Sequence, residues 1–346
     1  MNNFAQELRD TAKALMAEGK GILAMDESNG TCNRRFEALS IPTTENNRRA
    51  YRELILTAPD LSNYISGATL YEETIRQSSQ DGVPFVKVMI DAGMIPGIKV
   101  DTGVKMLALS SQEKVTEGLD AVRDRLIEYY QMGARFARWR AVIIIGEDIP
   151  SDGSILANAH ALARYAALCQ ENGLVPIVEP EVLIDGSHTI ERCYEVTEKT
   201  LWQVFNQLFL MGVAYDGMIL KPSMVISGAA CNVQASIEEV AKATMECLLN
   251  NVPATVPGIA FLSGGQSAVR SAAYLNAMNQ AYRDKMPWRV TFSYARAIQQ
   301  PALEHWRGNP DNIAKAQKLL LHRAMCISAA SQGKYNAEME KQPALV

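Results

Sequence analysis

The stretch Gly217-Met218-Ile219-Leu220-Lys221-Pro222 is a short apolar run that ends in a lysine and a proline. A run of this length beside turn signals is typical of a buried strand, and the proline, which cannot donate to a sheet ladder, predicts that the strand ends there. An amine at the end of an apolar core is partly desolvated, which favours the neutral form that attacks carbonyls. Lys221 is therefore a candidate nucleophile, although strand-end lysines more often extend their ammonium group into solvent.

Seven further apolar runs have the same character and alternate with segments of helical periodicity. The eight runs are residues 21–26, 64–71, 97–101, 136–145, 174–179, 217–221, 258–263 and 290–294. Between them, apolar residues such as Ile155, Ala159 and Leu162 recur at helical spacing, and Ser236 with Glu239 predicts a capping box. Most runs are almost continuously apolar, as expected for strands covered on both faces. Eight alternations predict a closed parallel (β/α)8 barrel; the competing doubly wound sheet lacks a Gly-x-Gly-x-x-Gly motif after the first run.

The length of 346 residues exceeds the usual single-domain size, but barrels of this kind form one domain at such lengths. We expect a single (β/α)8 domain over residues 1–346, with an N-terminal helix at about 1–18 and a C-terminal tail at about 334–346. The formal net charge of −4 gives no reason to expect nucleic acid or an anionic membrane as a partner. No apolar stretch reaches membrane-spanning length, and the N-terminus lacks the pattern of a secretory signal.

The cysteines and histidines argue against a disulfide framework and a metal centre. Six scattered cysteines with no Cys-x-x-Cys pair indicate reduced thiols in a cytoplasmic protein. The four histidines form neither His-x-His nor His-Glu-x-x-His, so we expect no metal site built from histidine.

Charged residues end or interrupt most of the runs, and strand ends are where such a barrel carries its catalytic groups. These residues are Asp26, Lys99, Asp101, Arg138, Arg140, Glu179, Glu181 and Lys221. Residues two apart on a strand share a face, so Arg138 and Arg140 project together, as do Glu179 and Glu181. Solvated charges at a rim would explain one or two such ends. They do not explain so many, because burying charge near a core is costly unless the charges compensate one another or serve chemistry.

Small residues follow the seventh and eighth runs instead, in Ser263-Gly264-Gly265-Gln266 and Ser293-Tyr294-Ala295-Arg296. Small side chains let backbone N–H groups approach an anion, and the loops after strands seven and eight are the usual phosphate site of this fold. Arg296 would add a bidentate contact to a phosphate group. The sequence therefore predicts a phosphate site at this part of the barrel rim.

Eight motifs in a fixed order carry a resemblance to a known family. They are residues 21–28, 45–49, 97–101, 133–140, 175–181, 220–225, 261–267 and 292–296. Together they closely resemble class I fructose-1,6-bisphosphate aldolases, the metal-independent Schiff-base type, and the bacterial and plant members more than the vertebrate ones. The resemblance implies reversible cleavage of fructose 1,6-bisphosphate to dihydroxyacetone phosphate and glyceraldehyde 3-phosphate. It also implies that no cofactor is needed and that the protein is a homo-oligomer, a tetramer in this family.

The resemblance also implies a role for each candidate residue. Lys221 resembles the Schiff-base lysine, and Glu179, with Glu181 beside it, the acid/base that protonates the leaving water. Asp26 resembles the carboxylate that takes the proton of the C4 hydroxyl, and Arg140 belongs to the cationic cluster around these carboxylates. One phosphate is implied to bind at Ser263, Gly264, Gly265, Ser293, Ala295 and Arg296. The other end of the sugar is implied to bind at Ser28, Thr31, Arg35, Arg48 and Lys99.

The chain departs from the family at Arg138, where the family has a lysine that assists imine formation and carbon–carbon cleavage. Arginine keeps the positive charge, which can orient Glu179 and favour a neutral Lys221, but it cannot release a proton at neutral pH. One hypothesis is that Arg138 is a handicap, so that Arg138→Lys raises turnover about ten-fold or more. The alternative is a pocket adapted through a bidentate pair with Glu179 or Asp26, in which case lysine lowers turnover and stability.

The departure at Arg138 has a further consequence, and the C-terminal end of the sequence is a second departure. Arg138 leaves open an alternative function, a catalytically impaired or substrate-altered homologue that binds sugar phosphates. The printed chain also ends at Gln342–Val346 without the C-terminal tyrosine found in eukaryotic members.

Overall fold

Eight parallel strands close into a barrel in the order β1-β10-β9-β8-β7-β6-β3-β2 in this computed structural model, which describes residues 4–341. The strands are β1 (Gly21–Ala24), β2 (Ile65–Leu70), β3 (Ile95–Lys99), β6 (Phe136–Ile143), β7 (Val175–Val182), β8 (Ile219–Leu220), β9 (Gly258–Phe261) and β10 (Arg289–Tyr294). Each strand coincides with or overlaps one of the eight predicted runs. The single-domain (β/α)8 barrel is therefore confirmed.

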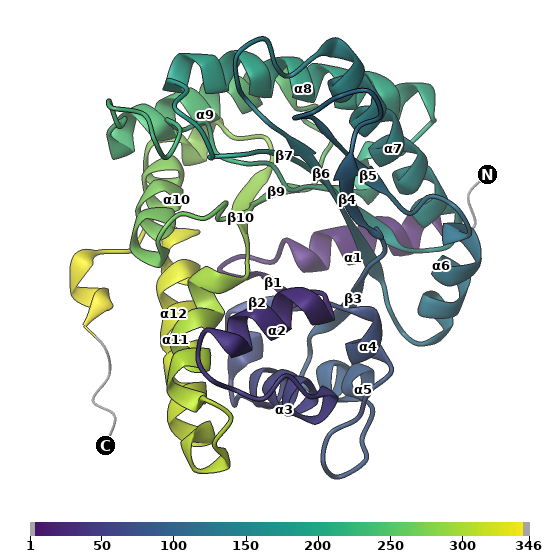
Figure 1. Cartoon of the computed structure of the whole chain (residues 1–346), viewed down its shortest axis with the longest axis vertical. Helices are drawn as coiled ribbons and strands as arrows, with labels where there is room; N and C mark the ends of the chain where they lie inside the picture. The colour runs from purple at the N-terminus through teal and green to yellow at the C-terminus, as the bar shows by residue number, and fades with distance from the viewer. Residues whose placement is uncertain (1–3, 342–346) are drawn as a thin grey trace.

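Helices surround the barrel (Figure 1). They are α1 (Ala5–Leu15), α2 (Asn29–Glu37), α3 (Glu45–Leu56), α4 (Glu72–Ile75), α5 (Phe85–Asp91), α6 (Val122–Gln131), α7 (Asp152–Glu171), α8 (Ile190–Leu210), α9 (Ile237–Asn251), α10 (Ala268–Tyr282), α11 (Arg296–Trp306) and α12 (Ile313–Ala330). Short 3-10 helices cover Leu61–Asn63, Tyr215–Gly217, Arg283–Lys285, Pro310–Asn312 and Ala337–Glu340. The capping box predicted at Ser236 and Glu239 is present at the start of α9. Between residues 4 and 341, no helix combines the length and apolar character needed to cross a membrane.

The lower part of the barrel interior is apolar and packs against α1. The inward-facing strand residues in this cluster are Ile22, Phe136, Val175, Ile177, Ile219 and Ala260. Side chains alternate along a strand, so the residue two positions after Ile177, which is Glu179, faces the same interior nearer the C-terminal end. The same step from Ile219 leads to Lys221. The inward-facing side chains of these strands are thus apolar in the lower part of the barrel and charged at its C-terminal end.

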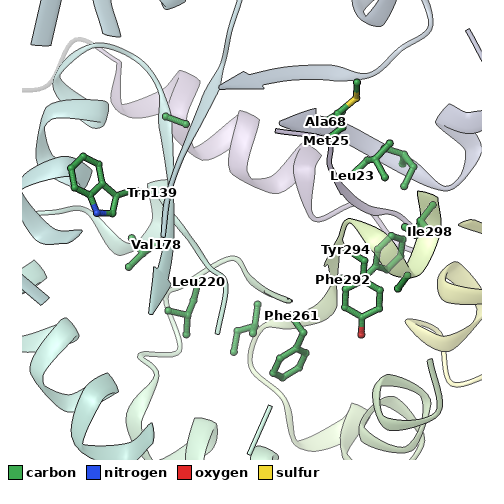
Figure 2. Packing of buried hydrophobic residues seen from close by; sticks show 14 of the residues in the cluster. Leu23, Met25, Ala68, Trp139, Val178, Leu220, Phe261, Phe292, Tyr294 and Ile298 are labelled. Atoms are coloured by element: carbon green, nitrogen blue, oxygen red, sulfur yellow. The ribbon is translucent and has the colours of Figure 1, made fainter. Parts of the chain in front are cut away.

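The outward faces of the strands form the main core between barrel and helices. Figure 2 shows Trp139, Val178 and Leu220, from β6, β7 and β8, in this cluster. Val178 directly precedes Glu179, and Leu220 directly precedes Lys221. Packing of these apolar side chains against the helices fixes the strands, and the fixed strands aim the adjacent charged side chains inward.

An antiparallel hairpin that the sequence analysis did not predict follows β3. It consists of β4 (Gly103–Met106) and β5 (Lys114–Glu117). The Thr116 hydroxyl donates to the carbonyl oxygen of Arg140 at 2.6 Å, and Glu113 accepts from both the backbone N–H and the hydroxyl of Ser151. These contacts hold the hairpin beside the mouth of the barrel.

Helical structure occurs near both ends of the described residues. Within the N-terminal segment predicted at 1–18, α1 covers Ala5–Leu15, and the short helix Ala337–Glu340 lies in the expected tail. Gln342–Val346, the segment without a terminal tyrosine, lies outside the described residues.

Candidate active site

A cavity of about 760 Å³ opens at the C-terminal ends of the barrel strands. The predicted residues that line it are Asp26, Ser28, Thr31, Lys99, Arg138, Arg140, Glu179, Glu181, Lys221, Ser263, Gly264, Gly265, Ser293, Ala295 and Arg296. Another cavity, of about 370 Å³, lies at the opposite end of the barrel and contains none of the predicted residues. The structure therefore gathers nearly all of the predicted site around one cavity.

Lys221 directly follows β8 and is only 3% exposed. Its backbone N–H donates to the carbonyl oxygen of Val178 at 2.8 Å, and its Nζ lies 3.4 Å from a carboxylate oxygen of Glu179. Burial lowers the pKa of the Lys221 ammonium; Glu179 opposes this shift and the positive charge of Arg138 reinforces it. The net lowering increases the fraction of Lys221 that is neutral and nucleophilic.

Arg138 connects the two catalytic carboxylates predicted from the sequence. Its Nη2 donates to Glu179 Oε1 at 2.8 Å, its Nε donates to the other oxygen of Glu179, and its Nη1 donates to Asp26 Oδ2 at 2.9 Å. Burial alone would raise the pKa of Glu179, but the charges and hydrogen bonds of Arg138 and Lys221 outweigh it and lower the pKa to about 2. Glu179 is therefore ionised at neutral pH.

A second ion pair lies one step nearer the cavity mouth. Arg140 donates through Nε to a carboxylate oxygen of Glu181. The carboxylate of Glu181 is almost buried, whereas 36% of the Arg140 side chain is exposed. Arg140 thus presents positive charge to the cavity while it compensates a buried carboxylate.

The predicted phosphate site combines two loops and a helix terminus. Gly264 and Gly265 adopt φ values of +53° and +87°, a left-handed conformation that glycine adopts without steric cost. The first turn of α11 begins at Arg296 and has no side-chain cap, so the backbone N–H groups of Arg296 and Ala297 remain available to an anion, whereas the next two already donate to the Ala295 carbonyl. The hydroxyl of Ser293 is buried and, within the described residues, lacks a hydrogen-bond partner. This wall therefore offers backbone N–H groups and a hydroxyl that can donate hydrogen bonds to an anionic ligand.

The opposite wall carries Ser28, Thr31 and Lys99. The Ser28 side chain caps α2 by accepting from the backbone N–H of Thr31. The Nζ of Lys99 lies 2.7 Å from Asp101 Oδ1 and donates to the Asp101 carbonyl oxygen, also at 2.7 Å. Two hydroxyls and one ammonium group therefore lie across the cavity from the glycine-rich loop.

Arg35 and Arg48 do not line this cavity. Arg35 forms an ion pair with Glu27 and donates to Gln300 Oε1 at 3.1 Å. Arg48 binds both carboxylate oxygens of Glu73, at 2.7 Å each. In this structure both guanidinium groups stabilise the wall behind the cavity instead of lining it.

Several lining residues were missed or given no role in the sequence analysis. They are Glu27, Tyr71, Asp101, Asp185 and the hairpin residues Thr102, Gly103 and Val104. The sequence does contain a signal for Tyr71, because it is the last residue of the predicted run 64–71, and the ends of the other runs carry polar residues of the site. The hairpin residues had none, because the apolar pattern that identifies buried strands is absent from this segment.

Comparison with known proteins agrees with the fold. A family model described as fructose-bisphosphate aldolase class-I matches residues 7–345. The probable fructose-bisphosphate aldolase class 1 of Xanthomonas campestris is 59% identical over 331 residues, which cover 95% of this chain and 98% of that protein. The chloroplastic fructose-bisphosphate aldolase 3 of Arabidopsis thaliana is 50% identical over 344 residues, covering 99% of this chain and 86% of that protein.

A solved structure of fructose-bisphosphate aldolase from Plasmodium falciparum, in complex with TRAP and a small-molecule inhibitor, aligns with a TM-score of 0.95. It is 45% identical, and the alignment covers 97% of each chain. The barrel and these relatives define the class of protein as a carbon–carbon lyase. The chain belongs to the class I fructose-bisphosphate aldolase family. The predicted family is thus confirmed, and nothing in the comparisons supports the alternative of an impaired homologue.

Proposed function

We propose that this protein cleaves fructose 1,6-bisphosphate reversibly into dihydroxyacetone phosphate and glyceraldehyde 3-phosphate through a Schiff base on Lys221. One observation carries the proposal: the amine of Lys221 is buried at the cavity floor, 3.4 Å from Glu179 and with a lowered pKa. Membership of the aldolase family supports the reaction, and this geometry supports Lys221 as the nucleophile.

Imine formation needs a proton to move between Lys221 and the departing oxygen. Glu179 accepts a proton from the Lys221 ammonium, and the neutral amine adds to the C2 carbonyl of the sugar. A proton then passes from the added nitrogen to the oxygen, which gives a C2 hydroxyl. Glu179 returns the proton to the C2 hydroxyl, which leaves as water and produces a protonated imine. The 3.4 Å between Lys221 Nζ and Glu179 suits this exchange after a small movement.

Carbon–carbon cleavage uses the protonated imine as the electron sink. Asp26 takes the proton of the C4 hydroxyl, the C3–C4 bond breaks, and its electrons flow into the imine to form an enamine. C4 becomes the aldehyde carbon of glyceraldehyde 3-phosphate. The proton held by Asp26 returns to C3 of the enamine, and hydrolysis of the resulting imine by water releases dihydroxyacetone phosphate and restores Lys221.

The two phosphates are assigned to opposite walls of the cavity. The C1 phosphate is attached next to the C2 carbon that bonds to Lys221, so it belongs to the loops after β9, which neighbours β8, and after β10, the next strand along. We assign it to Ser263, Gly264, Gly265, Ser293, Ala295 and Arg296. The C6 phosphate is four carbons further from C2 and reaches the wall that carries Ser28, Thr31 and Lys99.

Arg138 serves as a fixed guanidinium between the two carboxylates. It holds Glu179 and Asp26 in place through three hydrogen bonds, and its charge opposes protonation of Lys221. Since a guanidinium does not release a proton at neutral pH, the proton transfers fall to Glu179 and Asp26. Arg138 therefore positions and polarises the site without exchanging protons.

We further propose a cytoplasmic homo-oligomer, the tetramer that the family resemblance implies. Six free thiols support a reducing compartment. The exposed apolar side chains Trp202, Phe209 and Leu210 of α8 support association between copies of the chain. Light scattering after size exclusion tests this assignment, and a monomer at micromolar concentration would reject it.

Borohydride trapping tests the chemistry directly. Incubation with dihydroxyacetone phosphate and borohydride should reduce the imine to a stable secondary amine, found by mass spectrometry on the peptide that contains Lys221. Lys221→Ala should abolish this adduct and leave the protein folded, whereas Lys20→Ala, at the opposite end of the barrel, should retain it. An adduct on another lysine in the Lys221→Ala protein would reject the assignment.

A further inference from the structure

Tyr71 directly follows β2 and faces the inside of the barrel. A Cβ built on Gly67 of β2 would lie 2.9 Å from the side chain of Leu15 and 3.1 Å from that of Phe136, so position 67 faces the interior. Tyr71 lies four positions later in extended backbone, with φ −90° and ψ 160°, and therefore has the same orientation. Its side chain accordingly lines the catalytic cavity.

The Tyr71 hydroxyl is available to a ligand. The buried phenols of Tyr51, Tyr165 and Tyr294 each donate a hydrogen bond to a protein oxygen, whereas the Tyr71 hydroxyl has no hydrogen-bond partner among the described residues. Burial raises the pKa of the Tyr71 phenol, and the charges of nearby carboxylates raise it further. The phenol thus keeps its proton and can donate it in a hydrogen bond.

The carboxylates near Tyr71 do not exclude an anion, because each is paired with a cation. Glu73 is bound by Arg48 at 2.7 Å, and Asp101 is bound by Lys99 at 2.7 Å. The third carboxylate, Glu72, is exposed to solvent and pairs at 3.4 Å with Arg76, which directly follows α4. Each of these negative charges is thus accompanied by a neighbouring positive charge, which reduces the repulsion of an anionic ligand.

In the barrel order, β2 lies directly opposite β8, which leads into Lys221. Tyr71 thus shares the wall of Ser28, Thr31 and Lys99, to which the phosphate four carbons beyond the imine is assigned. We propose that the Tyr71 hydroxyl donates a hydrogen bond to the substrate phosphate farther from Lys221 and so favours a sugar bisphosphate over a 1-phosphate. This inference rests on the proposed aldolase function and adds a residue that determines substrate specificity.

Steady-state kinetics of Tyr71→Phe on fructose 1,6-bisphosphate and fructose 1-phosphate test the proposal, because only the first substrate carries the distal phosphate. Loss of one hydrogen bond to a charged group should lower kcat/KM for the bisphosphate about ten-fold, mostly through KM. The value for fructose 1-phosphate should stay within about two-fold, which also shows that the variant is folded. Tyr64→Phe is the matched control. Tyr64 directly precedes β2 and lies outside the cavity, so its substitution should change kcat/KM for neither substrate.

Three outcomes would overturn the proposal. Tyr71→Phe could leave kcat/KM for the bisphosphate unchanged. It could also lower kcat/KM for both substrates equally, which would indicate a general structural role. If the wild-type protein cleaves neither sugar, the proposed function fails first and this inference fails with it. The wild-type rates therefore separate failure of the function from failure of the specificity assignment.

Discussion

Arg138 binds both carboxylate oxygens of Glu179 and reaches Asp26 with its remaining nitrogen. The three acceptors come from β7 and from the loop after β1, so the planar guanidinium connects opposite sides of the barrel. The sequence left open whether arginine at this position is a handicap or part of an adapted pocket. The bidentate pair favours the adapted pocket, because its geometry matches a planar fork and not an ammonium group.

The structure therefore changes the expected effect of Arg138→Lys. A lysine ammonium can replace only some of the three hydrogen bonds that Arg138 makes. It therefore leaves Glu179 or Asp26 without a full set of partners in a buried site. We expect turnover on fructose 1,6-bisphosphate to fall about ten-fold and the free energy of unfolding to fall by about 2–3 kcal/mol. Steady-state kinetics and urea unfolding of the two proteins measure these effects.

Arg140→Lys is the matched variant for stability, since Arg140 lies two residues along the same strand in a more exposed pair. Its unfolding free energy should fall by less than that of Arg138→Lys. A faster enzyme with unchanged stability in the Arg138→Lys form would restore the view that Arg138 is a handicap.

Lowering the pH should reduce the free energy of unfolding through protonation of Glu179. The pKa of Glu179 is lowered from 4.5 to about 2 in the folded state, so its contribution to stability is fully present above 4.5 and is lost as pH falls through about 2. Between these values the unfolded state binds more protons than the folded state. Glu179→Gln removes this titration. The slope of the unfolding free energy against pH should therefore decrease, in this pH range, by an amount equivalent to about one bound proton.

Guanidinium unfolding of both proteins at successive pH values provides the measurement. The wild-type protein should be more stable at neutral pH, and the difference between the two proteins should shrink as the pH is lowered. Parallel curves throughout the window would mean that the pKa of Glu179 is not depressed in the folded state.

The sequence predicts the barrel well because each of its strands is a compact apolar run. It predicts the site because Lys221 and Glu179 end such runs and Arg138 interrupts one. It could not reveal that Arg138 binds two carboxylates at once, since Glu179 and Asp26 come from separate parts of the chain. Nor could it reveal that Arg35 is held by Glu27 behind the cavity, because a charged residue gives no pattern that indicates its partner.

Turnover should be independent of added divalent metal. The protonated imine on Lys221 can accept the electrons of the C3–C4 bond, so the proposed reaction requires no metal ion to stabilise the enamine. Prolonged treatment with EDTA, followed by assay in metal-free buffer, should leave kcat unchanged within error. A marked loss of activity that zinc restores would reject the Schiff-base class for this protein.

Glu27 should be essential to the cavity wall although no proton transfer is assigned to it. Its carboxylate pairs with Arg35 and lies 2.8 Å from Nη1 of Arg52, and both guanidinium groups are largely buried. Glu27→Gln keeps the size of the side chain but removes the charge that compensates two buried cations. Loss of one partner from a buried ion pair typically costs about 3–5 kcal/mol, so we expect a loss of this size in the free energy of unfolding.

Glu72→Gln, the same substitution in the exposed helical pair with Arg76, should cost at most about 0.5 kcal/mol. Urea unfolding of the three proteins compares these values, and similar losses in both variants would show that Glu27 is no more important than a surface charge.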